Sequence, residues 1–175
     1  MDRQMWAENI ADEARASISD FCINECKAYC CRKGFLIIKP HEIDAVSQGS
    51  RDELLRGKSL KRLENGSYSL NLDAEEGGCP SLKGNKCLIH ASKLRPKTCG
   101  DFPVYVKGDA VFFSPRCLAV KQNRFFPYEK AFIALGYRIL EASPWADIGL
   151  GEVSFPAAEK KEEKKAAKET GFISA

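Results

Sequence analysis

The chain has 175 residues, 8 of them cysteine, and it carries a formal net charge of +3. Its length fits one domain with a modest core, and its charge is too small to indicate nucleic acid as a partner. No apolar run approaches the ~18 residues that a membrane-spanning helix needs. Acidic residues occur throughout residues 1–20, unlike in a signal peptide. We therefore expect a cytoplasmic protein without membrane contact.

The eight cysteines are the feature of the composition that needs a chemical explanation. Their share of the chain is below the ~8–10% that is typical of a secreted disulfide scaffold. In a reducing compartment, thiols serve as metal ligands or redox groups more often than as structural disulfides. The composition therefore favours metal binding. Buried structural thiols and a redox pair at Cys30-Cys31 are the alternatives.

The hydrophobic pattern predicts a helix at the N-terminus. Within residues 3–18, every fourth residue from Trp6 to Ile18 is apolar, and charged residues occupy the other sides. The same row continues through three cysteines: Cys22, Cys26 and Cys30. Because residues four apart are neighbours on a helix surface, the continued row predicts three thiols on one helix face.

Short elements are predicted in the next part of the chain. Residues 35–38 have the pattern of a short buried strand. Residues 40–48 follow as a brief helix, because proline suits a first helical turn. Ser50 and Glu53 have the spacing of a capping box at the start of another helix, over residues 51–56.

Two hairpins are predicted from their turn residues. Asn65-Gly66 is the strongest short hairpin signal, and alternating apolar residues follow it. Gly108 lies in a second turn, which would connect strand 104–106 to strand 111–113. Together with a helix near each end of the chain, these hairpins predict an α+β fold, a small single domain stabilised by metal.

A second substantial helix is predicted near the C-terminus. It begins at Pro127 and extends to about Ala142, with apolar residues along one face. Lys and Glu alternate over residues 159–169, which indicates a solvated helix or a disordered tail. We expect a cysteine-cluster domain over residues 1–145 and a charged tail over residues 146–175.

The first cysteine group is Cys22-x3-Cys26-x3-Cys30-Cys31. A zinc ion needs four ligands at roughly 2.3 Å in a tetrahedron. An iron–sulfur cluster is larger and accepts cysteines that are spaced more widely, because each thiolate binds its own iron. The spacing is compatible with both, so the residues alone leave the choice between Zn²⁺ and a [4Fe-4S] cluster open.

The second cysteine group is Cys79, Cys87, Cys99 and Cys117. Its members are too far apart for a local knuckle and predict a site closed by several loops. Residues 73–117 are rich in Gly, Pro and Lys and have little periodic apolar surface. We therefore expect a metal to stabilise this segment.

Residues beside the second group have predicted supporting roles. His90 follows Cys87 at the spacing of a zinc half-site, although packing against the neighbouring loop is the favoured interpretation. Pro96 and Pro103 restrict the backbone on both sides of Cys99 and are expected to orient its sulfur. Arg95 is expected to support the site by pairing with thiolates. A site of one zinc and four thiolates carries a charge of −2, which the cations near the cysteines would offset.

The ordered motifs support a family resemblance. After the first group come Cys79-Pro80-x-Leu82, Cys87-Leu88-Ile89-His90, Arg95-Pro96-x2-Cys99-x2-Phe102-Pro103 and Cys117. This order resembles the CxxCxxCC, or YkgJ-like, family of zinc- or iron-chelating domains over about residues 20–120. One departure is the first group, which has x3 spacing where the family name has x2. The resemblance implies that the eight cysteines bind metal.

Two functions are compatible with this resemblance. The first is a metal-binding protein whose zinc or iron–sulfur cluster is structural or redox-active and which presents a surface to a protein partner. The second is an iron–sulfur accessory or electron-transfer component of a protein-modifying enzyme, because a similar cysteine cluster occurs in flagellin lysine N-methylases. No HExxH, P-loop or GxGxxG motif is present. The sequence therefore identifies no catalytic residue and leaves open whether the protein is an enzyme.

Overall fold

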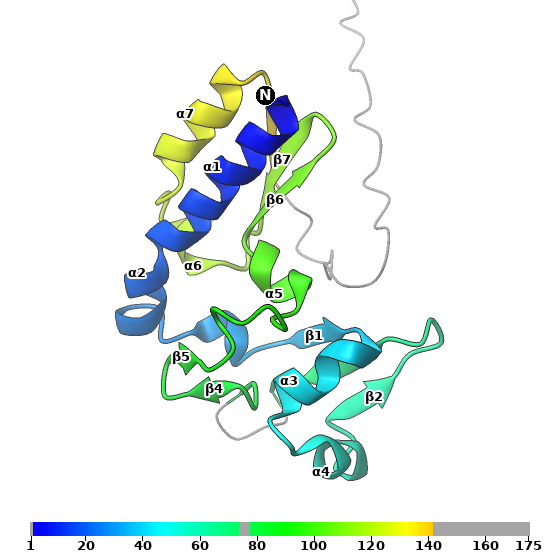
Figure 1. The fold of residues 1–175 in the computed structure, drawn as a ribbon. Coiled ribbons are helices and arrows are strands. Elements are labelled where there is room, and N and C mark those ends of the chain that lie inside the picture. Colours follow the sequence, from blue (N-terminus) through cyan, green and yellow to red (C-terminus); the bar gives the residue numbers. More distant parts are fainter. Residues whose placement is uncertain (1, 74–77, 142–175) are drawn as a thin grey trace, which may run out of the picture.

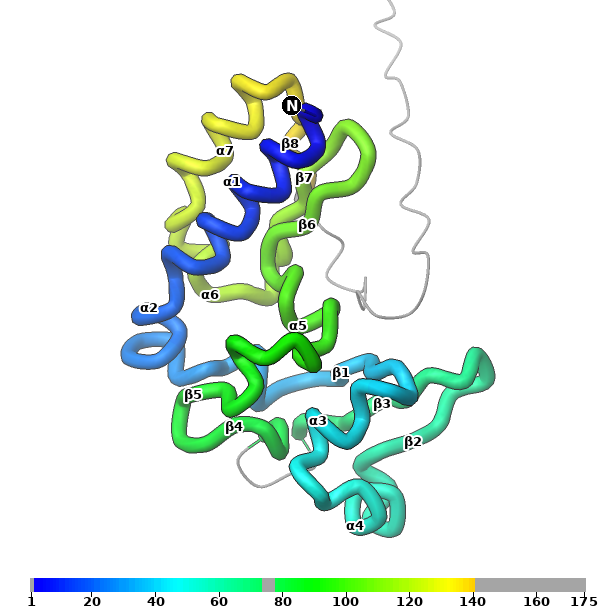
Figure 2. The backbone as a smooth tube through the Cα atoms, viewed as in Figure 1, coloured from blue at the N-terminus to red at the C-terminus, as the bar shows by residue number. Residues whose placement is uncertain are grey.

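A computed structural model describes residues 2–73 and 78–141 of the chain. Helices and three small sheets make up the described part, so the predicted α+β class is confirmed (Figure 1). The apolar side chains form two main cores. Short helices lie between them, and a small two-stranded hairpin lies beside the second core (Figure 2). No helix among the described residues is both long and apolar enough to cross a bilayer.

The first core lies between two helices and a three-stranded sheet. The helices are α1 (Arg3–Ser17) and α7 (Phe126–Ala134). The strands are β6 (Val104–Lys107), β7 (Ala110–Phe113) and β8 (Arg138–Glu141), in the order β6-β7-β8. Strands β6 and β7 pair antiparallel, which confirms the second predicted hairpin, whereas β8 runs parallel to β7.

The face of α1 that packs on this core differs from the predicted row. Ala7, Ala11 and Ala14 are fully buried, whereas Trp6 is 47% exposed. An α-helix has 3.6 residues per turn, so residues four apart drift around its surface and cannot all stay on one contact face. Because alanine is small, α1 can lie close to β6 and α7. Ile10 of the predicted row still packs against the edge of this core.

The C-terminal helix is shorter than predicted. Helix α7 ends at Ala134 because Gly136 adopts a left-handed φ of 78°. The N–H of Tyr137 donates to the carbonyl of Phe132 (3.0 Å), and the chain then enters β8. The predicted extension of the helix to about residue 142 is therefore wrong, because Arg138–Glu141 forms a strand. The predicted domain boundary at 145 and the charge run lie outside the described residues.

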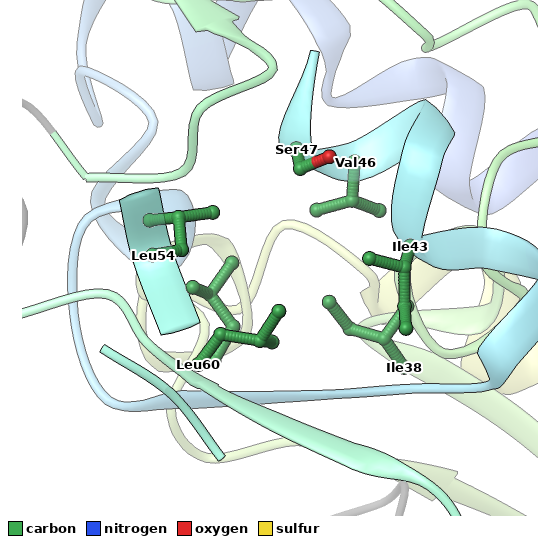
Figure 3. Close-up of a pocket in the computed structure, with 7 residues that line it drawn as sticks. Ile38, Ile43, Val46, Ser47, Leu54 and Leu60 are labelled. Atoms are coloured by element: carbon green, nitrogen blue, oxygen red, sulfur yellow. The ribbon is translucent and has the colours of Figure 1, made fainter. Parts of the chain in front are cut away.

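The second core is built on another three-stranded sheet, ordered β1-β3-β2 and antiparallel throughout. Its strands are β1 (Phe35–Ile38), β2 (Leu60–Arg62) and β3 (Tyr68–Asn71), which confirms the predicted strand 35–38 and the Asn65-Gly66 hairpin. Apolar side chains from the sheet and from two helices point toward one another in Figure 3. The space between them is too small for a water molecule, so this is a packed core and not a ligand pocket.

The helices over the second core agree with the prediction except at one cap. They are the 3₁₀ helix η2 (Pro40–Glu42), α3 (Ile43–Ser47) and α4 (Arg51–Arg56). The predicted capping box is wrong: the Ser50 hydroxyl donates to the carbonyl of Ser47 (2.6 Å), so its side chain does not cap α4. This bond instead ties α4 to the end of α3.

Five further short elements complete the described fold. They are α2 (Ser19–Asn24), the 3₁₀ helix η1 (Tyr29–Cys31), the hairpin of β4 (Leu82–Lys83) and β5 (Lys86–Cys87), α5 (Lys97–Asp101) and α6 (Leu118–Lys121). Figures 1 and 2 show α5 between the β6–β7 hairpin and β1, α2 and α6 near the end of α1, and the β4–β5 hairpin beside the β1-β3-β2 sheet. The cysteines lie on these elements or directly beside them.

Candidate metal centre

The helix that carries the first cysteine is interrupted, so the predicted row of three thiols on one helix face is wrong. Cys22 lies on α2, which ends at Asn24. Lys27 and Ala28 then adopt left-handed φ values of 55° and 54°. The Ala28 N–H donates to the carbonyl of Cys22 (2.8 Å), which folds the chain back. Cys30 and Cys31 follow on η1, where the helical spacing no longer applies.

Cys117 lies with the first cysteines of the chain although it follows them by more than 80 residues. It is a buried member of the first core, against which Cys22 and Cys26 also pack. The pKa of the Cys22 thiol is raised to about 12, mainly by burial and further by the charges of Cys117 and Cys26. The fold therefore groups Cys117 with Cys22 and Cys26.

Three other cysteines gather at the second core. Cys79 and Cys99 pack against its apolar cluster. Burial is the first cause that raises the pKa of Cys79 to about 11 and that of Cys99 to about 12, and the charge of Cys87 contributes to both. The buried Ser81 hydroxyl donates to the carbonyls of α3 at Val46 (2.8 Å) and Ala45 (3.1 Å), and this holds the loop after Cys79 on the second core.

Cys31 connects the cysteines of the first core to those of the second core. Its carbonyl accepts a hydrogen bond from the Cys79 N–H (2.8 Å), so the first cysteine cluster is joined to the loop of the second core. The pKa of Cys31 is lowered to about 7, first by the hydrogen bond that the Cys30 thiol donates to it and then by the charge of Arg95. The charge of Cys31 in turn acts on Cys22 and Cys99, which belong to different groups.

Arg95 is the cation that faces both groups. Its Nη2 donates to the carbonyl of Cys99 (2.8 Å) and its Nη1 to that of His90 (3.4 Å). Its charge acts on the thiols of Cys22, Cys31 and Cys99. Its Nε is buried and has no hydrogen-bond partner among the described residues. A buried donor without an acceptor is costly, and a nearby thiolate would supply the missing acceptor.

The turn between β4 and β5 is hydrogen-bonded to α2 and to the residue that follows η1. Arg32 donates from Nη2 to the carbonyl of Gly84 (2.6 Å) and to Oδ1 of Asn85 (3.2 Å). The Asn85 side chain donates to the carbonyl of Ile23 (3.0 Å). These bonds hold Cys87, on β5, near the segment that carries Cys22.

The side chains of these groups do not form a preorganised coordination shell. All eight cysteines are free thiols. Among residues 2–73 and 78–141, no three Cys, His, Asp or Glu side chains are arranged so that they could hold a metal ion. His90 and His41 are both exposed. The donor chemistry therefore fits zinc or an iron–sulfur cluster, whereas coordination requires the thiols to move closer together.

A comparison with protein families identifies this arrangement. A family model described as a "putative zinc- or iron-chelating domain", CxxCxxCC, matches residues 21–123, more than half of the chain. The chain belongs to the CxxCxxCC family. The matched range includes all eight cysteines, and the family description supports metal binding in general. The comparisons with curated proteins and with solved structures give no match.

Proposed function

We propose that the eight cysteines bind metal in two adjoining four-thiolate sites and that the metal joins the two cores of the domain. The observation that carries this proposal is that free thiols of both cores lie around Cys31 and Arg95. The charges of Cys31 and Arg95 both act on Cys22, which packs on the first core, and on Cys99, which packs on the second. One site would consist of Cys22, Cys26, Cys30 and Cys117, and the other of Cys31, Cys79, Cys87 and Cys99.

This grouping exchanges two cysteines relative to their order in the sequence. Cys117 joins the first site because it packs in the same core as Cys22 and Cys26. Cys31 joins the second because its carbonyl is bonded to the N–H of Cys79 and its charge acts on Cys99. Cys30 remains in the first site. Its thiol is hydrogen-bonded to Cys31, but the charges of Cys117 and Cys22 also raise its pKa.

The metal has a mainly structural role in this proposal. The two cores are connected by short elements, and the loops between them bury little apolar surface of their own. Bonds from one metal to thiolates of several loops would fix those loops without a larger core. Arg95 would donate its buried Nε–H to a thiolate and offset part of the negative charge.

The proposal is tested by metal analysis of protein purified without oxygen. Two zinc ions per chain in a colourless sample, or iron and sulfide in a brown one, would support four-thiolate sites. Cys117→Ser and Cys26→Ser should each remove the same site and leave the other, whereas Cys99→Ser should remove the second. The grouping is wrong if Cys117→Ser and Cys99→Ser remove the same metal and Cys26→Ser a different one. Metal-free chains after purification under these conditions would overturn the proposal itself.

A further inference from the structure

Residues 78–100 form an unusually basic part of the molecule. They contain Lys83, Lys86, Lys93, Arg95 and Lys97 and not a single Asp or Glu. Their charge therefore contrasts with that of the whole chain, in which 27 basic residues face 24 acidic ones. The segment runs from Cys79 through β4 and β5 to α5. In Figure 2 the β4–β5 hairpin lies beside the second core, and α5 lies between β1 and β6.

The cations of this segment fall into two sets with different surroundings. Arg95 is half-buried and acts on the thiols, and Lys97 is paired with Asp101. Lys83, Lys86 and Lys93 are exposed. In the part of the chain that the structure describes, no carboxylate forms an ion pair with any of these three lysines.

The β4–β5 hairpin brings like charges together. Lys83 and Lys86 lie directly opposite each other in the two-stranded ladder. The guanidinium of Arg32 is bonded to Gly84 and Asn85, in the turn that connects them. Like charges at opposite positions destabilise a hairpin. Lys83 and Lys86 therefore repel each other across the hairpin, and a bound anionic group would reduce this repulsion.

Two exposed leucines follow these lysines within two positions of the chain. Leu88 follows β5 directly and is 56% exposed, and Leu94 is adjacent to Lys93 and is 62% exposed. The N–H of Leu88 donates to the carbonyl of Ser81 (2.8 Å), so the backbone at this leucine is held against the buried Ser81 loop. Exposed apolar side chains that are rimmed by polar residues mark interaction sites, and unpaired lysines beside them favour an acidic partner.

We propose that Lys83, Lys86, Lys93, Leu88 and Leu94 form a docking surface for an acidic segment of another protein that carries leucine-sized apolar side chains. Carboxylates would relieve the repulsion at the hairpin, and apolar side chains would cover the leucines. Nucleic acid fits this surface less well. Single-stranded nucleic acid is bound by stacking on aromatic residues, and residues 78–100 contain no Phe, Tyr or Trp.

The first experiment is selection from a library of random peptides displayed on phage, with the full metal-loaded chain as bait. The expected result is enrichment of peptides that combine Asp or Glu with Leu, Ile or Phe. Selection with the double variant Lys83→Glu/Lys86→Glu as bait should not enrich these peptides. Enrichment without an acidic bias, or the same peptides with both baits, would overturn the proposal.

The second experiment measures the affinity of a labelled enriched peptide for variants of the chain. Lys83→Glu/Lys86→Glu should weaken binding about tenfold or more, and Leu88→Ser/Leu94→Ser should also weaken it. The matched control is Lys61→Glu/Arg62→Glu, which makes the same charge change at exposed positions of β2 and should retain affinity. If the control loses as much affinity for the peptide, only the net charge of the protein matters and the proposal is wrong.

Two readouts separate this proposal from that of the metal centre. Metal content should be the same in the wild type and in all three double variants, because none of them changes a cysteine or Arg95. A short single-stranded RNA should compete with the peptide poorly. If RNA binds more tightly than every selected peptide, and Lys83→Glu/Lys86→Glu abolishes that binding, the surface is a nucleic-acid site and the proposal is wrong.

Discussion

Gly78 lies against the backbone of the first cysteine loop. A Cβ at this position would be 2.5 Å from the carbonyl oxygen of Cys31 and 2.7 Å from the Cα of Arg32, and its φ is +93°. Only glycine combines this φ with this close an approach. The residue thus allows the loop of Cys79 to reach the loop of Cys31.

Replacing Gly78 tests this close approach, and Gly66 is its matched control. Gly66 has a similar φ of +82°, with no atom within 4 Å of an added Cβ. Gly66→Ala should cost about 1–2 kcal/mol of unfolding free energy, the price of the left-handed conformation alone. Gly78→Ala should cost about 1–3 kcal/mol more, because backbone must also move. Denaturant unfolding measures both, and equal losses would contradict the contact.

Arg95 has a predicted influence on metal affinity that depends on its buried Nε. Arg95→Gln should lower the affinity for Zn²⁺ about 10–100-fold, as is usual when a group that orients metal ligands is removed. Arg95→Lys keeps the charge but loses the planar set of donors, so its affinity should be intermediate. Competition with a chromophoric chelator gives the values. Lys93→Gln, an exposed control, should match the wild type, and an Arg95→Gln value equal to that of Lys93→Gln would refute the role.

At the scale of elements, β8 is joined to the β6–β7 turn by an ion pair. Arg138 donates from Nε and Nη2 to the two carboxylate oxygens of Asp109, at 3.1 and 2.9 Å. Its backbone N–H also donates to the Asp109 carbonyl (3.0 Å). These bonds hold β8 at the start of its parallel pairing with β7, where Ala110 lies opposite Arg138.

This ion pair predicts a pH-dependent contribution to stability. Hydrogen bonds from Arg138 lower the pKa of Asp109 in the folded chain. The stabilisation is therefore fully present above the unfolded carboxyl pKa of ~3.9 and is lost as the pH falls through the lower folded value. At about pH 6, the wild type should unfold at a higher urea concentration than Asp109→Asn. At about pH 3, the difference between the two unfolding midpoints should be smaller. A difference that stays constant between these pH values would contradict the assignment.

At the scale of the whole molecule, the cysteine-bearing segments adjoin two apolar cores, each of which is built mainly on its own sheet and helices. The first core is completed by α1, α7 and the β6-β7-β8 sheet, and the second by α3, α4 and the β1-β3-β2 sheet. The segment over residues 78–101 instead has one two-stranded hairpin and one five-residue helix. Metal should therefore contribute most to the order of this segment.

Removal of metal should loosen residues 78–101 first. In hydrogen exchange, their amides should lose protection in the metal-free protein, whereas those of α1 and β7 should keep most of theirs. From the sequence alone, the segment expected to depend on metal extends to residue 117. The structure shortens it, because β6 and β7 are buried in the first core. A metal-free preparation that melts cooperatively at the same temperature as the loaded protein would disprove a structural metal.

The charge balance of the molecule also changes with metal. The formal charge of +3 counts all thiols as neutral. Eight thiolates and two Zn²⁺ ions change it to +3 − 8 + 4 = −1. The exposed lysines of the docking surface would then stand out from a nearly neutral molecule, which favours a local and specific acidic partner over general binding to polyanions.

The sequence by itself determined the α+β class, the two main hairpins, the short helices over the second core and the family, because these depend on turn residues, local periodicity and ordered motifs. The tertiary structure decided where helices end and which thiols meet. Left-handed residues at 27 and 28 break the row of cysteines, and Gly136 allows β8 to form. Cys117 joins Cys22 through long-range burial in one core, and spacing along a chain does not encode how its loops close in space.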